Sequence, residues 1–211
     1  MAGRRVGEKS VYPPLAPEDT ATGPARFSKG GRLLQIEYAR ECPQSGPLAV
    51  AMRLRGGVLL AKGKATKPEL GFRIPLVWPI SRSLAYVANG NLGDMFYLQD
   101  VLATKGPRSF DEAAHVIRRT LHDHAVRNDV RPLAMLILLG GIHRGKPQLA
   151  GFDVTGSQFT CDAWAFGQGD RRARNRLIGS WDERLTEATA RNLATKIYRA
   201  QPHEVSIVRR P

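Results

Sequence analysis

The chain has 211 residues, of which 42% are hydrophobic and 24% are charged, as expected for one folded domain with a full core. No apolar run reaches the ~18 residues of a membrane helix, and Cys42 and Cys161 match no metal-ligand spacing. These features argue against an integral membrane protein, a disulfide-built domain and a zinc module. Without a secretory leader pattern, a reducing compartment is expected, and we predict the cytoplasm.

The charge is unusual, because 32 Lys and Arg against 19 Asp and Glu give a net charge of +13. A field of this sign favours an acidic partner such as nucleic acid, an anionic membrane or an acidic protein face. A solvated basic surface without such a partner explains the charge equally well.

The chain begins with a segment that is predicted to be an extended arm, residues 1–26. Its four prolines and mixed charges cannot build a core, and Arg4 and Arg5 make its start basic. Residues 27–211 are predicted to form the folded domain. It opens with a short amphipathic helix over residues 32–41, which Pro43 and Gly46 are predicted to end.

The rest of the chain alternates pairs of strands with pairs of helices. Ser109 and Glu112 have the spacing of a capping box. This order predicts an α+β fold in which two antiparallel sheets lie between two layers of helices, an αββα sandwich. The predicted elements are strands at 48–55, 58–63, 74–80 and 83–88, helices at 91–102 and 109–126, strands at 133–139, 148–153 and 158–165, helices at 170–181 and 186–200, and a strand at 205–209.

One ungapped segment carries a family signature, Phe27-Ser28-Lys29-Gly30-Gly31-Arg32-Leu33-Leu34-Gln35-Ile36-Glu37-Tyr38-Ala39-Arg40. It resembles the start of α-type proteasome subunits, and further landmarks extend the similarity over roughly residues 27–208. The resemblance implies the αββα sandwich of the N-terminal-nucleophile hydrolases. It also implies that the opening helix packs on neighbouring subunits, with assembly residues Leu33, Gln35, Ile36, Tyr38 and Ala39. The apolar stripe on this helix is predicted to face protein rather than water.

The resemblance also locates the positions where catalytic members of the fold carry their chemistry. Their nucleophile is the side chain of the first residue of the first strand, which is released by cleavage after a glycine. Here that junction is Gly46-Pro47, and proline has neither hydroxyl nor thiol. The carboxylate position on the second strand is Gly63. The supporting Ser, Asp and Ser positions fall at Gln168, Arg184 and Ala188. We therefore predict a protein that is not an enzyme and needs no cofactor, metal or small-molecule substrate.

Two marks of the α-ring role are missing from the sequence. The Tyr-Asp-Arg triplet expected shortly before the Phe-Ser pair is absent. The lysine that grips the carboxylate of ATPase activators falls near Leu76, with Arg73 as the nearest cation. The resemblance thus implies the fold and the ring-type helix without the gate or the activator pocket.

Arginines gather in the predicted helix that begins at Asp170. Arg171, Arg172, Arg174 and Arg176, together with Arg4 and Arg5, are candidate nucleic-acid contacts, because arginine forks bind phosphates bidentately. No RNA-binding signature accompanies them, so binding would rest on backbone and shape recognition. Two functions remain open. The first is a catalytically inactive, α-type proteasome-like structural subunit. The alternative is a proteasome-fold protein reused as a basic RNA-binding component, for example on a ribosome.

Overall fold

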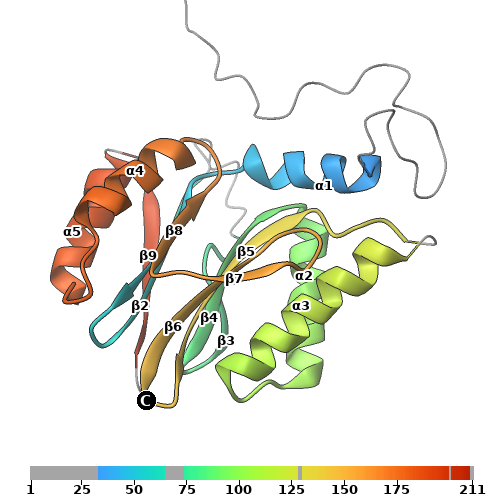
Figure 1. Ribbon diagram of the computed structural model, residues 1–211, viewed down its shortest axis with the longest axis horizontal. Helices are drawn as coiled ribbons and strands as arrows, with labels where there is room; N and C mark the ends of the chain where they lie inside the picture. Colours follow the sequence, from blue (N-terminus) through green and yellow to red (C-terminus); the bar gives the residue numbers. More distant parts are fainter. Residues whose placement is uncertain (1–32, 65–73, 128–129, 200, 210–211) are drawn as a thin grey trace, which may run out of the picture.

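The computed structural model describes residues 33–64, 74–127, 130–199 and 201–209, and the predicted arm 1–26 lies outside this part of the chain. Figure 1 shows two β-sheets packed face to face, with α4 and α5 covering one outer face and α2 and α3 covering the other. The predicted αββα sandwich is therefore confirmed.

The smaller sheet has four antiparallel strands in the order β8-β1-β2-β9. Its centre is the hairpin of β1 and β2, in which Leu54 pairs with Gly57 across the tight turn. Apolar residues on both faces make these central strands almost fully buried. The bounds are β1 Ala49–Leu54, β2 Gly57–Gly63, β8 Ala163–Phe166 and β9 His203–Arg209.

The larger sheet has five antiparallel strands in the order β3-β4-β5-β6-β7. Side chains of both sheets, among them Val58, Leu60, Val87 and Leu138, interdigitate between them as one core. The bounds are β3 Trp78–Ser81, β4 Leu84–Gly90, β5 Met135–His143, β6 Lys146–Phe152 and β7 Gln158–Thr160.

The helix layers begin and end at recognisable capping residues. The Asn91 side chain accepts from the backbone N–H of Gly93 at 2.9 Å where α2 begins, and the Ser109 hydroxyl accepts from the N–H of Glu112 at 3.2 Å where α3 begins. The bounds are α2 Leu92–Lys105, α3 Phe110–Val126, α4 Asp170–Ser180 and α5 Glu187–Tyr198. None of the helices within the described ranges is long and apolar enough to cross a bilayer.

The first helix, α1 (Leu34–Gln44), crosses one end of the sandwich. The prediction that Pro43 ends this helix was wrong, because Pro43 lies inside its last turn. The chain stays helical beyond it through bonds that do not need the missing proline N–H: Ser45 donates to the Glu41 carbonyl and Gly46 to that of Pro43, both at 3.4 Å.

The prediction of one strand over residues 158–165 was also wrong. Residues 158–160 form β7 in the larger sheet and residues 163–166 form β8 in the smaller one. The crossing is held on both sides, because the Cys161 N–H donates to the Leu149 carbonyl at 3.2 Å and the Asp162 carbonyl accepts from the N–H of Arg53 at 2.7 Å. The remaining boundaries shift by up to four residues: β3 begins at Trp78 rather than at residue 74, and β5 ends at His143 rather than at residue 139.

Candidate functional site

The segment before β1 is held in one conformation by contacts from two other parts of the chain. The Asn89 side-chain amide donates to the Pro47 carbonyl at 2.7 Å, and the Gln168 backbone N–H donates to the Gly46 carbonyl at 2.9 Å. Gln168 also donates from its side chain to the Ser45 carbonyl at 3.0 Å. A residue predicted to fill a supporting catalytic position thus acts here as a backbone clamp.

Gly167 allows this clamp to close. Its φ of +95° lies in the left-handed region, and a Cβ there would lie 2.5 Å from the Pro47 carbonyl oxygen. Only glycine both adopts this φ readily and leaves room for the Pro47 carbonyl oxygen. The junction Gly46-Pro47 is therefore enclosed by β4 on one side and the turn before α4 on the other.

The structure brings together Pro47 and Gly63, the positions that the family resemblance assigns to the nucleophile and the carboxylate. A Cβ on Gly63 would lie 3.7 Å from the Cβ of Pro47, within ordinary contact. Neither residue carries a hydroxyl, thiol or carboxylate. Of the other two supporting positions, Arg184 and Ala188 both lie on the surface. Leu76 is half-buried in the bend before β3, and Arg73 lies outside the described residues.

Lys62, next to Gly63, is a buried cation whose position the sequence reasoning did not interpret. Successive strand residues point to opposite faces, so its amine lies between the sheets with Val58 and Leu60, where it donates to the Ala88 carbonyl at 2.5 Å. Burial lowers the pKa of Lys62 to about 8. A lone lysine in an otherwise apolar strand was the available signal.

Asn89 is a second residue that the sequence reasoning missed. It is almost fully buried in β4, and its Oδ1 atom has no hydrogen-bond partner within the described part of the chain. Its amide is used to hold Pro47. These contacts fix the backbone at the start of β1.

Helix α1 places its predicted assembly residues on two different faces. Ile36 and Ala39 are buried against Val154, with Leu33 alongside, so the apolar stripe packs within the same chain. Gln35 is half-buried. Tyr38 points outward with 46% of its surface exposed. Of the five predicted residues, Tyr38 is the one that offers a large side chain to a neighbour.

The candidate arginines of α4 are also not equivalent. Arg171, Arg172 and Arg176 are exposed. Arg174 instead pairs with Asp170 at 2.7 Å, and its guanidinium carbon lies 4.9 Å from the centre of the Trp164 ring. Arg4 and Arg5 lie outside the described residues. Within the described ranges, no three His, Cys, Asp or Glu side chains gather as a metal site would require.

Comparison with known proteins agrees with the αββα fold. The family model "Proteasome subunit" matches residues 44–204. The chain is 26% identical over 192 residues to the proteasome subunit alpha of Methanobrevibacter smithii, covering 85% of this chain and 77% of the relative. It is 31% identical over 154 residues to the proteasome subunit alpha of Methanosarcina acetivorans, covering 68% of this chain and 62% of the relative. It is also 28% identical over 152 residues to the proteasome subunit alpha 2 of Haloarcula marismortui, covering 67% of this chain and 62% of the relative. The chain thus spans less than two thirds of the length of some of these relatives.

Proposed function

Because the chain belongs to the proteasome subunit family, on its α-type side, we propose that it is a catalytically inactive structural subunit that assembles with other protein subunits. The observation that carries the proposal is Pro47, which stands where β1 is entered and faces Gly63. An acyl shift at this junction needs a side-chain oxygen or sulfur on the downstream residue. Proline supplies neither.

The outer faces of two helices support the assembly part of the proposal. Tyr38 on α1 is 46% exposed, and Phe96 and Tyr97 on α2 are 46% and 45% exposed. Exposed aromatic side chains are enriched at protein interfaces, where they contribute much of the binding energy. The buried stripe of α1 gives Tyr38 a rigid base, since Ile36 and Ala39 anchor the helix to its own domain.

A first experiment tests the chemistry. The purified full chain should keep its original N-terminus, with no cleavage between Gly46 and Pro47, and should not be labelled by a threonine-directed covalent inhibitor. Intact-mass spectrometry reads out both. A new N-terminus at Pro47, or one inhibitor adduct per chain, would contradict the inactive assignment.

A second experiment tests assembly. Native mass spectrometry of the tagged protein purified from its source should show it bound to other subunits. Tyr38→Glu should weaken that assembly, because it buries a charge in the contact. Ile178→Glu, at an apolar residue of α4 that is 82% exposed, is the matched control and should leave it intact. Equal effects of the two substitutions, or none, would argue against α1 as the assembly surface.

The RNA-binding alternative rests on the three exposed arginines of α4, Arg171, Arg172 and Arg176. If they contact phosphates, affinity for RNA should fall steeply with salt, since each contact releases a counterion. Reversing all three to Glu should then flatten this dependence. A weak RNA titration of the wild type that does not change with salt would remove the alternative. For either function we propose the cytoplasm. Cys42 and Cys161 are both free thiols, which suits a reducing compartment.

A further inference from the structure

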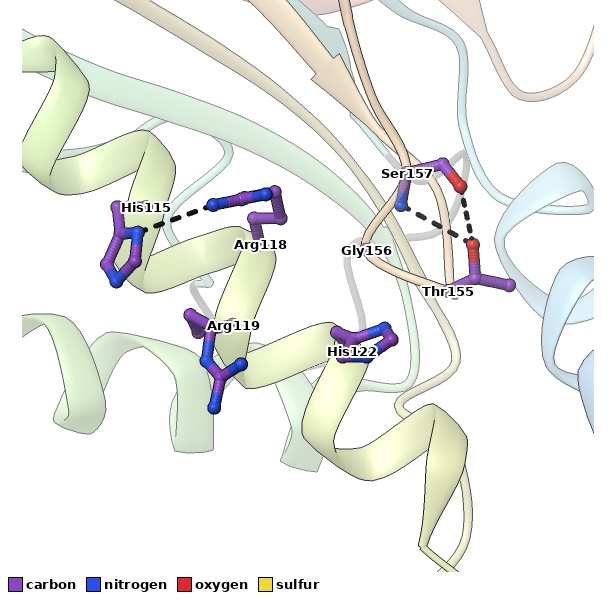
Figure 2. Close-up of a pocket in the computed structure, with 7 residues that line it drawn as sticks. All are labelled: His115, Arg118, Arg119, His122, Thr155, Gly156 and Ser157. Atoms are coloured by element: carbon purple, nitrogen blue, oxygen red, sulfur yellow. Dashed lines mark hydrogen bonds between the residues drawn. The ribbon is translucent and has the colours of Figure 1, made fainter.

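A basic hollow of about 550 Å³ lies between α3 and the turn that joins β6 to β7. Figure 2 shows its two walls. One is a row of His and Arg side chains on α3, and the other is the turn that carries the hydroxyls of Thr155 and Ser157. The lining residues are His115, Arg118, Arg119, His122, Thr155, Gly156 and Ser157.

The helical wall presents its four basic side chains on one face. Positions i, i+3, i+4 and i+7 lie above one another on a helix, and His115, Arg118, Arg119 and His122 have this spacing. All four are exposed. Seven residues at about 1.5 Å each extend over roughly 10 Å of helix. The wall therefore offers an elongated row of donors rather than a single point charge.

The opposite wall is held rigidly by Asp153. Its carboxylate bonds to residues of the turn and to Arg40 on α1. One oxygen of this carboxylate accepts from the Thr155 N–H at 2.9 Å, the Thr155 hydroxyl at 2.6 Å and the Ser157 N–H at 3.0 Å. The other oxygen pairs with Arg40 at 3.4 Å. The Ser157 hydroxyl lies 2.8 Å from that of Thr155 and is exposed at the rim.

Gly156 fixes the distance between the two walls. Its φ is +79°, and a Cβ there would lie 2.6 Å from the Arg118 carbonyl oxygen and 2.9 Å from the His122 nitrogen. The turn therefore rests directly on the backbone of α3. A side chain at this position would push the walls apart without removing any charge.

Among the described residues no carboxylate lines the hollow, so the positive charge of its arginines is only weakly balanced. Arg119 pairs with Asp123 at 3.3 Å, but both side chains are about half exposed, at 58% and 48%. Such a pair contributes little and exchanges readily. The Arg118 guanidinium approaches the Nδ1 atom of His115 at 3.5 Å, which adds no negative charge.

The geometry points to a site for a condensed phosphate, such as pyrophosphate or the diphosphate end of a larger ligand. Guanidinium forks bind phosphate oxygens bidentately, and a phosphate group has more acceptor oxygens than a carboxylate, so it can bind both arginines and a hydroxyl at once. The volume lies in the range of small-molecule sites. The described residues that line it include no Phe, Tyr or Trp, so they offer a base no ring on which to stack. This inference is independent of the proposed assembly.

The test is calorimetric titration of the full-length protein with sodium pyrophosphate at low salt. Arg118→Gln combined with Arg119→Gln should weaken binding by about tenfold or more, because two charge-assisted contacts are lost. Arg171→Gln combined with Arg172→Gln removes the same charge from α4 and should change the affinity less than about twofold. Gly156→Ala keeps every charge and should also weaken binding, provided that its circular dichroism spectrum is unchanged.

Three results would overturn the assignment. The first is no binding of pyrophosphate by the wild type at millimolar concentration. The second is an equal loss in the α3 and α4 double variants, which would show a general charge effect. The third is a single-stranded RNA that binds more tightly than pyrophosphate and loses affinity only in the α4 variant. Similar affinities for pyrophosphate and adenosine diphosphate would support recognition of the phosphates alone.

Discussion

Replacing the buried amine of Lys62 should stabilise the protein, and the gain should disappear at alkaline pH. Burial lowers the pKa of Lys62 from 10.5 to about 8. Each pKa unit corresponds to about 1.4 kcal/mol, so keeping this amine charged in the folded state costs about 3 kcal/mol at neutral pH. Lys62→Met removes this cost and loses one charge-assisted hydrogen bond to the Ala88 carbonyl, which is worth about 2 kcal/mol. The expected net gain at pH 7 is therefore about 1 kcal/mol.

The sign of the pH dependence follows from the direction of the shift. Because the folded pKa lies below the unfolded one, the unfolded chain binds more protons between pH 8 and 10.5. The stability contributed by this residue therefore rises with pH in that window. The variant lacks this rise, so its advantage should be constant below about pH 8 and should shrink steadily above it.

The assay is urea unfolding of both proteins at pH 7, 8, 9 and 9.5. Burial raises the pKa of Cys161 to about 12 and also raises those of Tyr86 and Tyr198, so these groups lower stability as pH rises. They are present in both proteins and cancel in the difference. Lys64→Met, at an exposed neighbour, is the matched control and should not change the pH profile. A stability difference between Lys62→Met and wild type that stays flat across this range would refute the reasoning.

Further predictions concern two contacts that fix the ends of elements. Arg131→Ala should cost about 3 kcal/mol of unfolding free energy in chemical denaturation, because it leaves the buried Asp94 carboxylate without its bidentate partner. A loss below about 0.5 kcal/mol would show that the N–H of Ala134 is enough to satisfy Asp94. Gly167→Ala should lower the melting temperature and loosen the junction at Pro47, because the new Cβ would lie 2.5 Å from the Pro47 carbonyl oxygen. The Gln168 N–H, which donates to the Gly46 carbonyl, should then exchange faster with solvent. Unchanged protection of this amide would contradict the prediction.

The sequence by itself determined the local elements and their order. Two apolar runs on either side of Gly56-Gly57 predicted the strands at 48–55 and 58–63, and the antiparallel register of β1 and β2 confirms them. Ser109 and Glu112 predicted the start of α3, where the Ser109 hydroxyl accepts the expected bond. The opening signature predicted the family. These features depend on neighbours within a few residues of the same segment, so a linear pattern contains them.

Tertiary structure decided everything that depends on which segments meet. The sequence predicted one strand over residues 158–165, and nothing in its local pattern shows that the chain changes sheets at Cys161. The apolar stripe of α1 was predicted to pack on protein. Only the fold shows that its partner is Val154 of the same chain. The low pKa of Lys62 likewise arises because a second sheet excludes water from one face of β2. Burial and contact are properties of residues far apart in the chain, and a linear pattern does not specify which of them come together.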